Sequence, residues 1–155
     1  LGVLMVIVIF CFWYTRPRSL DALVGEGKIT SITLLAQVGR EGDDGKAFID
    51  TWQVESNGER GYVNSGLEEI FKSCQYRMSL RSLFPFPSHD KIYGKEGAPV
   101  LLVSAAIENG PGFTAVCRGP VVKFTIGGRT ILTQAEDDEI GEKLLAYTQE
   151  FGWET

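Results

Sequence analysis

The sequence predicts an α+β fold, in which two short helices pack on a mostly antiparallel sheet and a truncated N-terminal transmembrane helix precedes the domain. Three observations lead to this prediction. The chain opens with an uncharged apolar run, several later segments alternate apolar and polar residues, and two segments repeat apolar residues every three or four positions. We therefore expect a partial transmembrane anchor at 1–15, a linker at 16–27 and a single α+β domain at 28–155.

Composition and charge limit the classes of function. The 155 residues suffice for one domain, and 44% hydrophobic and 23% charged residues are typical of a globular protein. The formal net charge of −5 argues against nucleic acid as a partner and against binding to acidic lipid through the domain surface. The single histidine, His89, is too few for a histidine-rich metal site or a two-histidine acid–base mechanism.

The opening segment, residues 1–14, carries no charge and has the composition of a membrane helix. As a helix it would be about 21 Å long, short of the ~30 Å hydrocarbon core of a bilayer. Because the first residue is not methionine, we expect upstream residues, of which about six apolar ones would complete a span. Trp13 and Tyr14 occupy the place of interfacial aromatic residues, and Arg16 and Arg18 follow at the depth of the lipid headgroups.

Other interpretations of this segment stay open. A cleaved signal peptide has an apolar region of this length, but no small-x-small cleavage site follows. A buried core helix is compatible with 14 apolar residues as well. A type IV pilin stem fits less well, because Pro17 interrupts the helix. Arg16 and Arg18 alone would favour a cytoplasmic domain under the positive-inside rule.

The first half of the domain is expected to consist mainly of strands. Residues 28–38 and 46–56 place apolar side chains on one face with a period of two, and a charged loop at 40–45 separates them. Asn57-Gly58 favours a type I′ turn, because both residues tolerate positive φ. Residues 59–63 are therefore expected to return as the partner strand of a hairpin.

A helix and a further strand are expected next. Ser65 and Glu68 form a capping box, and the apolar residues after them fall on one helical face that ends at Cys74. The residues from 75 onward alternate as a half-buried strand that ends near Ser82. Three prolines in 84–99 predict a loop or an irregular crossing.

The C-terminal half predicts a meander that ends in a helix. Residues 98–108 form a long apolar segment, Asn109-Gly110-Pro111-Gly112 predicts a turn, and strands are expected at 113–118 and 120–126. Gly127-Gly128 then predicts a hairpin into a strand at 129–133. A capping box and a regular apolar spacing predict the last helix; its residues are Thr133 and Glu136 for the cap, and Ile140, Leu144, Tyr147 and Phe151 for the apolar face.

The proline-rich loop supplies the candidate partner-binding residues. Aromatic side chains on a loop suit recognition of a partner, and the residues concerned are Phe84, Phe86, His89 and Tyr93. The alternative is that Phe84 and Phe86 cover the edge of the sheet while His89 is solvated. We predict no catalytic residues.

Two other groups of residues have an ordinary structural interpretation. Residues 136–139 are all acidic, as a calcium site requires, but they lie at a helix start, where negative charge is stabilising. We therefore predict no metal and no cofactor. Cys74 and Cys117 would pair as a disulfide in an oxidising compartment or be buried as free thiols, whereas Cys11 lies in the membrane segment.

The layout of the chain resembles small uncharacterised membrane-anchored domains of Gram-positive bacteria. Its matching parts are a compact α+β body and, before it, an apolar start that ends with Trp13-Tyr14-Thr15-Arg16-Pro17-Arg18-Ser19-Leu20. The resemblance is one of overall layout. It implies a single-pass protein of the cell membrane whose domain lies outside the cytoplasm. It transfers no catalytic residue.

These observations favour a membrane-tethered, non-catalytic interaction or sensing domain. Its partners would be the membrane, through the N-terminal helix, and an envelope protein or ligand. The alternative is an envelope hydrolase that uses carboxylates such as Asp50 or Glu108, for which two carboxylates about 5–9.5 Å apart would be needed. A weaker third possibility is an accessory subunit whose membrane helix contacts a neighbouring complex.

Overall fold

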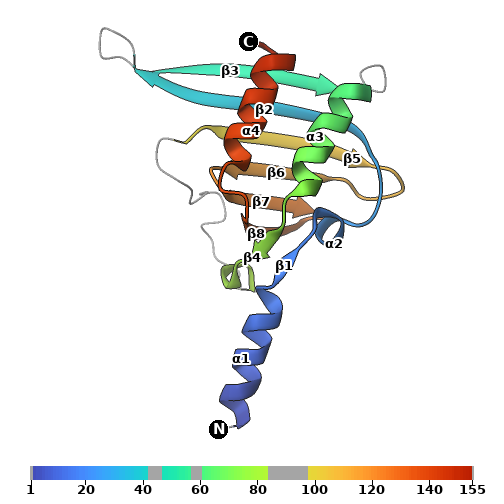
Figure 1. The fold of residues 1–155 in the computed structure, drawn as a ribbon, viewed down its shortest axis with the longest axis vertical. Coiled ribbons are helices and arrows are strands. Elements are labelled where there is room, and N and C mark those ends of the chain that lie inside the picture. Colours follow the sequence, from blue (N-terminus) through green and yellow to red (C-terminus); the bar gives the residue numbers. More distant parts are fainter. Residues whose placement is uncertain (1, 42–46, 57–60, 84–97, 155) are drawn as a thin grey trace.

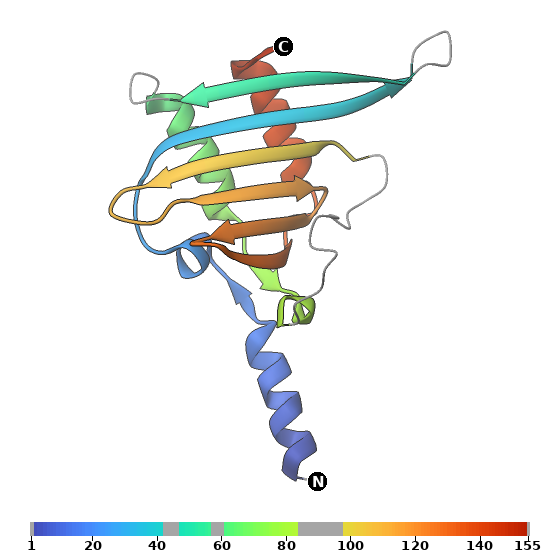
Figure 2. The ribbon, with the colours of Figure 1, turned by 180° about the vertical axis from the view of Figure 1, so that it is seen from behind.

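The structure, a computed structural model, describes residues 2–41, 47–56, 61–83 and 98–154. In this part of the chain, a nine-stranded antiparallel sheet carries two helices on one face, and no described element covers the opposite face (Figures 1 and 2). The predicted α+β class, with helices packed on a mostly antiparallel sheet, is confirmed. The strand order is β1-β4-β8-β7-β6-β5-β2-β3-β9.

The strands vary greatly in length. The longest, β2 and β3, form a hairpin at one side of the sheet, and the two-residue strands β1 and β9 lie at its two edges. Their bounds are β1 (Pro17–Arg18), β2 (Ile29–Glu41), β3 (Ala47–Ser56), β4 (Tyr76–Met78), β5 (Val100–Ile107), β6 (Phe113–Arg118), β7 (Val121–Ile126), β8 (Arg129–Ala135) and β9 (Trp153–Glu154).

The helices have different surroundings. The sheet-covering pair is α3 (Gly61–Ser73) and α4 (Ile140–Phe151), which lie side by side across the strands (Figure 1). The short α2 (Leu20–Val24) begins at Ser19, whose hydroxyl accepts a hydrogen bond from the Ala22 amide at 3.3 Å. A 3₁₀ turn, η2 (Leu80–Leu83), follows β4. The first helix, α1 (Gly2–Tyr14), projects away from the sheet.

The core lies between the sheet and the helix pair. Alternate residues of β2, β5 and β6 point into it, as the period of two predicts, and apolar residues of α3 and α4 meet them. Phe124 is the centre of an aromatic cluster, with ring centroids 5.2 Å from Tyr76 and 5.7 Å from Phe113. Leu20 and Val24 of α2 are also buried, so the segment predicted as a linker contributes to the core.

Several local predictions are wrong. Residues 61–63 belong to α3 rather than to a strand, so β3 pairs with β2 and β9 and the predicted hairpin after Asn57-Gly58 does not form. Ser65 lies inside α3, which excludes it as the helix N-cap. Thr133 is a buried residue of β8 whose hydroxyl donates to the Val122 carbonyl at 2.8 Å, and α4 begins at Ile140 instead. The strand from residue 75 ends at Met78.

The other predicted elements are observed close to their expected bounds. Strands β5, β6 and β7 and helix α4 fall within the segments whose apolar spacing predicts them, and β8 extends two residues beyond its predicted end. Gly127 and Gly128 both have positive φ, at 54° and 79°, so the hairpin turn uses two glycines as expected.

Within the described ranges, no helix is both long enough and apolar enough to cross a membrane.

Candidate functional site

The uncovered sheet face presents two neighbouring rows of side chains. One row crosses five strands and carries a hydroxyl group at every position, with neighbours about 4.8 Å apart; we call it the hydroxyl row, and its members are Thr33, Ser104, Thr114, Thr125 and Thr130. The next row along the strands is mainly aliphatic: its members are Leu35, Leu102, Val116, Lys123 and Leu132. Polar donors and acceptors therefore lie beside a strip of exposed apolar surface.

Register places these residues on the face away from the helices. Their neighbours in sequence, such as Leu34, Val103 and Ala115, point into the core with almost no exposed surface. Leu102 exposes 38% of its surface, although it lies on an internal strand of the sheet. The face can thus form both hydrogen bonds and apolar contacts with a flat partner.

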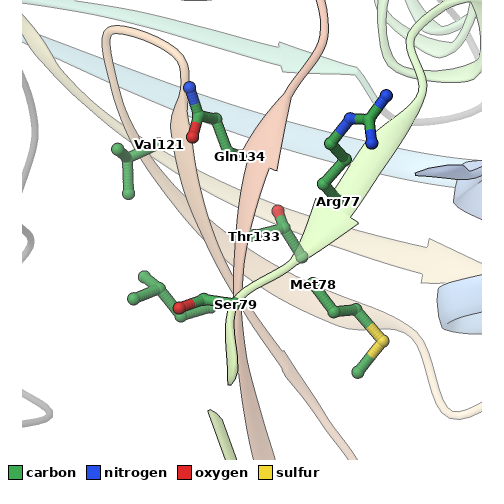
Figure 3. Close-up of a pocket in the computed structure, with 7 residues that line it drawn as sticks. Arg77, Met78, Ser79, Val121, Thr133 and Gln134 are labelled. Carbon is green, nitrogen blue, oxygen red and sulfur yellow. The ribbon is translucent and has the colours of Figure 1, made fainter. Parts of the chain in front are cut away.

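A depression of about 250 Å³ lies at the β4–β8–β7 end of this face. Figure 3 shows that Arg77, from β4, and Gln134, from β8, project the same way from paired positions. The apolar lining of the depression comes from Met78, Val121 and Leu132. The volume is below the ~300–1,000 Å³ of typical small-molecule pockets, so the depression suits a single side chain of a partner better than a cofactor.

Arg77 is held by an ion pair at the rim of this depression. Its Nη2 atom lies 2.7 Å from Oε1 of Glu136, and its Nε donates to the same oxygen at 3.1 Å. Both side chains are substantially exposed, so the pair orients the guanidinium group and adds little to stability. An incoming carboxylate would compete with Glu136 for this arginine.

Two side chains of the acidic run at 136–139, Glu136 and Asp137, have local partners. Glu136 binds Arg77, while Asp137 accepts a hydrogen bond from the Glu139 amide at 3.0 Å and pairs with Lys143. The hydrogen bond from Lys143 lowers the pKa of Asp137 below its ordinary value. Within the described residues, no cluster of three or more histidine, cysteine or acidic side chains is arranged to hold a metal ion.

The carboxylates considered for a hydrolase are far apart. Asp50 pairs in register with Val38, whereas the Glu108 amide donates to the Lys28 carbonyl at 2.9 Å. Lys28 and Val38 lie about 30 Å apart along one extended segment, at a rise of ~3.3 Å per residue. Asp50 also forms an ion pair with Arg40 at 3.1 Å. These two carboxylates cannot act together on one bond.

The cysteines are free thiols. Cys74 and Cys117 are buried in the core, and burial raises the pKa of both, that of Cys117 to about 12. A raised pKa leaves little thiolate at neutral pH, which is the opposite of what a nucleophilic cysteine requires. Both residues therefore act as apolar packing groups.

The predicted partner-binding loop lies outside the described residues. Phe84, Phe86, His89 and Tyr93 all fall in 84–97, so that prediction stays untested. By contrast, the sequence contains a signal for the hydroxyl row, because Thr33, Ser104 and Thr114 occupy outward positions of alternating segments. Only the pairing register brings them into one row.

Comparison with known proteins adds no information on this site. No protein-family model, curated protein or solved structure matches the chain.

Proposed function

We propose that this chain is a membrane-tethered, non-catalytic interaction or sensing domain. In this proposal α1, which is too short to cross a bilayer on its own, lies in the cell membrane as the described part of a single-pass anchor, and the α+β body lies outside the cytoplasm, as in the membrane-anchored domains of Gram-positive bacteria that the layout resembles. The partner is an envelope protein or ligand.

The exposure of α1 is the observation that carries the proposal. None of its residues is buried, and its large apolar side chains expose between 45% and 79% of their surface. Each such side chain costs about 1.5–3 kcal/mol to leave in water. A lipid environment removes that cost without any protein partner. The helix points away from the body in both views, so the sheet does not compete for its apolar surface (Figures 1 and 2).

The uncovered sheet face is proposed as the partner-binding surface. The hydroxyl row and the aliphatic row beside it supply hydrogen-bonding groups and apolar area on one surface. Hydroxyl groups beside aliphatic side chains on a flat sheet face suit contacts with a partner. Recognition therefore accounts for this surface better than chemistry does.

The test is protease treatment of intact cells that express the full-length protein with a C-terminal tag. We expect the tag to be removed from intact cells, with a cytoplasmic protein of the same cells left whole as the control. If the tag survives until lysis, the body is cytoplasmic, and Arg16 and Arg18 are the topology signal instead.

Membrane attachment is tested separately in the same cells. The protein should stay in the membrane pellet after alkaline carbonate extraction, whereas a variant that combines Val6→Glu and Val8→Glu should move to the supernatant. Release of the unmodified protein by carbonate would contradict the anchor.

A further inference from the structure

The junction between α1 and the body is short and hydrogen-bonded. α1 ends at Tyr14, and β1 begins at Pro17 and pairs with β4. Between them, both the amide and the hydroxyl of Thr15 donate to the Cys11 carbonyl, at 3.0 and 2.8 Å. Only residues 15 and 16 therefore separate α1 from β1, so a bilayer that holds α1 also keeps this end of the body close to its surface.

Cationic side chains gather at this junction. The guanidinium groups of Arg16 and Arg18 each lie 5.3 Å from the centre of the Trp13 ring, which is a cation–π distance. The Nε atom of Arg18 is buried and has no hydrogen-bond partner within the described part of the chain. Arg18 also lines a groove of about 210 Å³ together with Arg129, the first residue of β8. The other lining residues are apolar, and two arginines at one groove favour an anionic group such as a phosphate.

An apolar projection lies beside the same junction. In both views η2, the green turn that follows β4, is adjacent to the place where α1 joins β1 (Figures 1 and 2). Leu80 and Leu83 expose 37% and 42% of their surface. They are three residues apart, and in a 3₁₀ turn such side chains lie on the same side.

The projection is fixed to the sheet by hydrogen bonds. The Ser82 hydroxyl accepts from the Leu132 amide at 2.8 Å and donates to the Leu132 carbonyl at 3.1 Å. The Ser79 amide donates to the same carbonyl at 2.9 Å. Exposed leucines on a rigid turn, at the end of the body from which an apolar helix leaves, are placed to enter the boundary between headgroups and acyl chains.

We propose that the base of the body, formed by β1, η2 and the groove between Arg18 and Arg129, is a second membrane contact. Leu80 and Leu83 enter the bilayer boundary, and the two arginines bind lipid phosphates. This inference rests on the membrane attachment of α1 proposed above. The net charge of −5 does not oppose it, because Arg16, Arg18 and Arg129 gather at the base while Asp21, which is nearby, pairs with Lys72 at 3.4 Å.

The experiment measures the depth of nitroxide labels in the full-length protein, reconstituted in nanodiscs of phosphatidylcholine and phosphatidylglycerol. Labels are placed singly at Leu83→Cys, at Val6→Cys in α1 and at Leu102→Cys on the uncovered sheet face, in a Cys11→Ser background. Cys74 and Cys117 remain, because burial protects them from labelling. Leu102 is the matched control, since its exposure of 38% is close to that of Leu83. Collision with oxygen, relative to a water-soluble nickel reagent, reports the depth of each label.

We expect the labels at Val6 and Leu83 to collide with oxygen several-fold more often than with the nickel reagent. The label at Leu102 should collide more often with the nickel reagent. A lipid-exposed Val6 with a water-exposed Leu83 would overturn the base contact and leave the anchor intact. A water-exposed Val6 would overturn both. Lipid exposure of Leu102 together with Leu83 would also contradict the proposal, because the body would then lie on its sheet face. Equal thermal unfolding of the labelled proteins excludes misfolding as the cause.

Discussion

At the scale of single residues, Lys72 joins two helices that are distant in sequence. Its ammonium group lies 2.8 Å from Glu68, within α3, and 3.4 Å from Asp21 in α2, and it donates to the Gly27 carbonyl at 3.1 Å. The hydrogen bond with Glu68 raises the pKa of Lys72 above its ordinary value. The Glu68 contact follows from i,i+4 spacing, whereas the other two depend on the tertiary fold.

Replacement of this lysine should loosen α2 from α3. We expect Lys72→Met to lower the free energy of unfolding by about 1 kcal/mol, since partly exposed ion pairs are screened by solvent. Urea unfolding measures the change. Lys28→Met, at an exposed lysine, is the matched control and should have almost no effect. Equal losses in both variants would show that the contacts of Lys72 contribute nothing specific.

Asp137 gives a prediction on pH. Its pKa in the folded protein is lowered from the ordinary 3.8, so its contribution to stability is present above pH 3.8 and disappears as the pH falls through the lowered value. We expect the unmodified protein to lose more stability than Asp137→Asn between about pH 5 and 2. Thermal unfolding at each pH measures this. Asp138→Asn, at an exposed neighbour, is the control and should lose stability with falling pH as the unmodified protein does. If Asp137→Asn also lost stability to the same extent, the pH dependence would not come from Asp137.

At the scale of elements, the end of α4 fits closely against β3. A Cβ atom at Gly152 would lie 2.5 Å from the Gln53 carbonyl oxygen and would also clash with the Thr148 carbonyl. Both obstacles are backbone atoms, which cannot turn aside as a side chain would. Gly152 thus permits the chain to leave α4 and to pair as β9 with β3.

Gly152→Ala should therefore separate these elements. We expect a loss of about 1–3 kcal/mol in the free energy of unfolding, as for other overpacked contacts. Hydrogen exchange should increase at β9 and in the last turn of α4. Gly39→Ala is the control, because a Cβ atom there meets nothing within 4 Å. Unchanged stability of Gly152→Ala would indicate that the C-terminal segment is not packed as described.

At the scale of the whole molecule, the strand order places β1 at one edge of the sheet and β9 at the other. Because α1 leaves from the β1 edge, the β2–β3 hairpin lies at the far side of the body from α1 (Figure 1). Phe48 and Ile49 on this hairpin expose 45% and 68% of their surface. A membrane that holds α1 would leave the hairpin and the uncovered sheet face accessible to a partner.

The core also determines the behaviour of the thiols. We expect Cys74 and Cys117 to resist a thiol reagent in the native protein and to react after denaturation without any reductant, because both are buried and unbonded. A Cys11→Ser variant isolates their signal. If the denatured variant reacts only after reduction, a disulfide has formed and the packing of the core differs from the description above.

Local pattern accounts for the parts of the fold that were predicted correctly. The sequence pattern indicates which side chains are buried, through the alternation in 98–107 and 113–126 and through the spacing of Ile140 and Leu144. Each of these elements forms as expected. The prediction was wrong at 61–63, where helical spacing outweighs the signal of the preceding turn dipeptide. Leu67 and Phe71 fill the core without exposure, and this burial stabilises α3.

By itself, the sequence determined the α+β class, the inward face of most strands and an apolar helix at the start of the chain. Only the tertiary structure decided that β2 pairs with both β3 and β5, that the hydroxyl row is continuous, and that η2 lies beside α1. The reason is physical. Periodicity records whether a side chain is buried, which is a local property, whereas pairing and neighbourhood depend on contacts between segments distant in the chain.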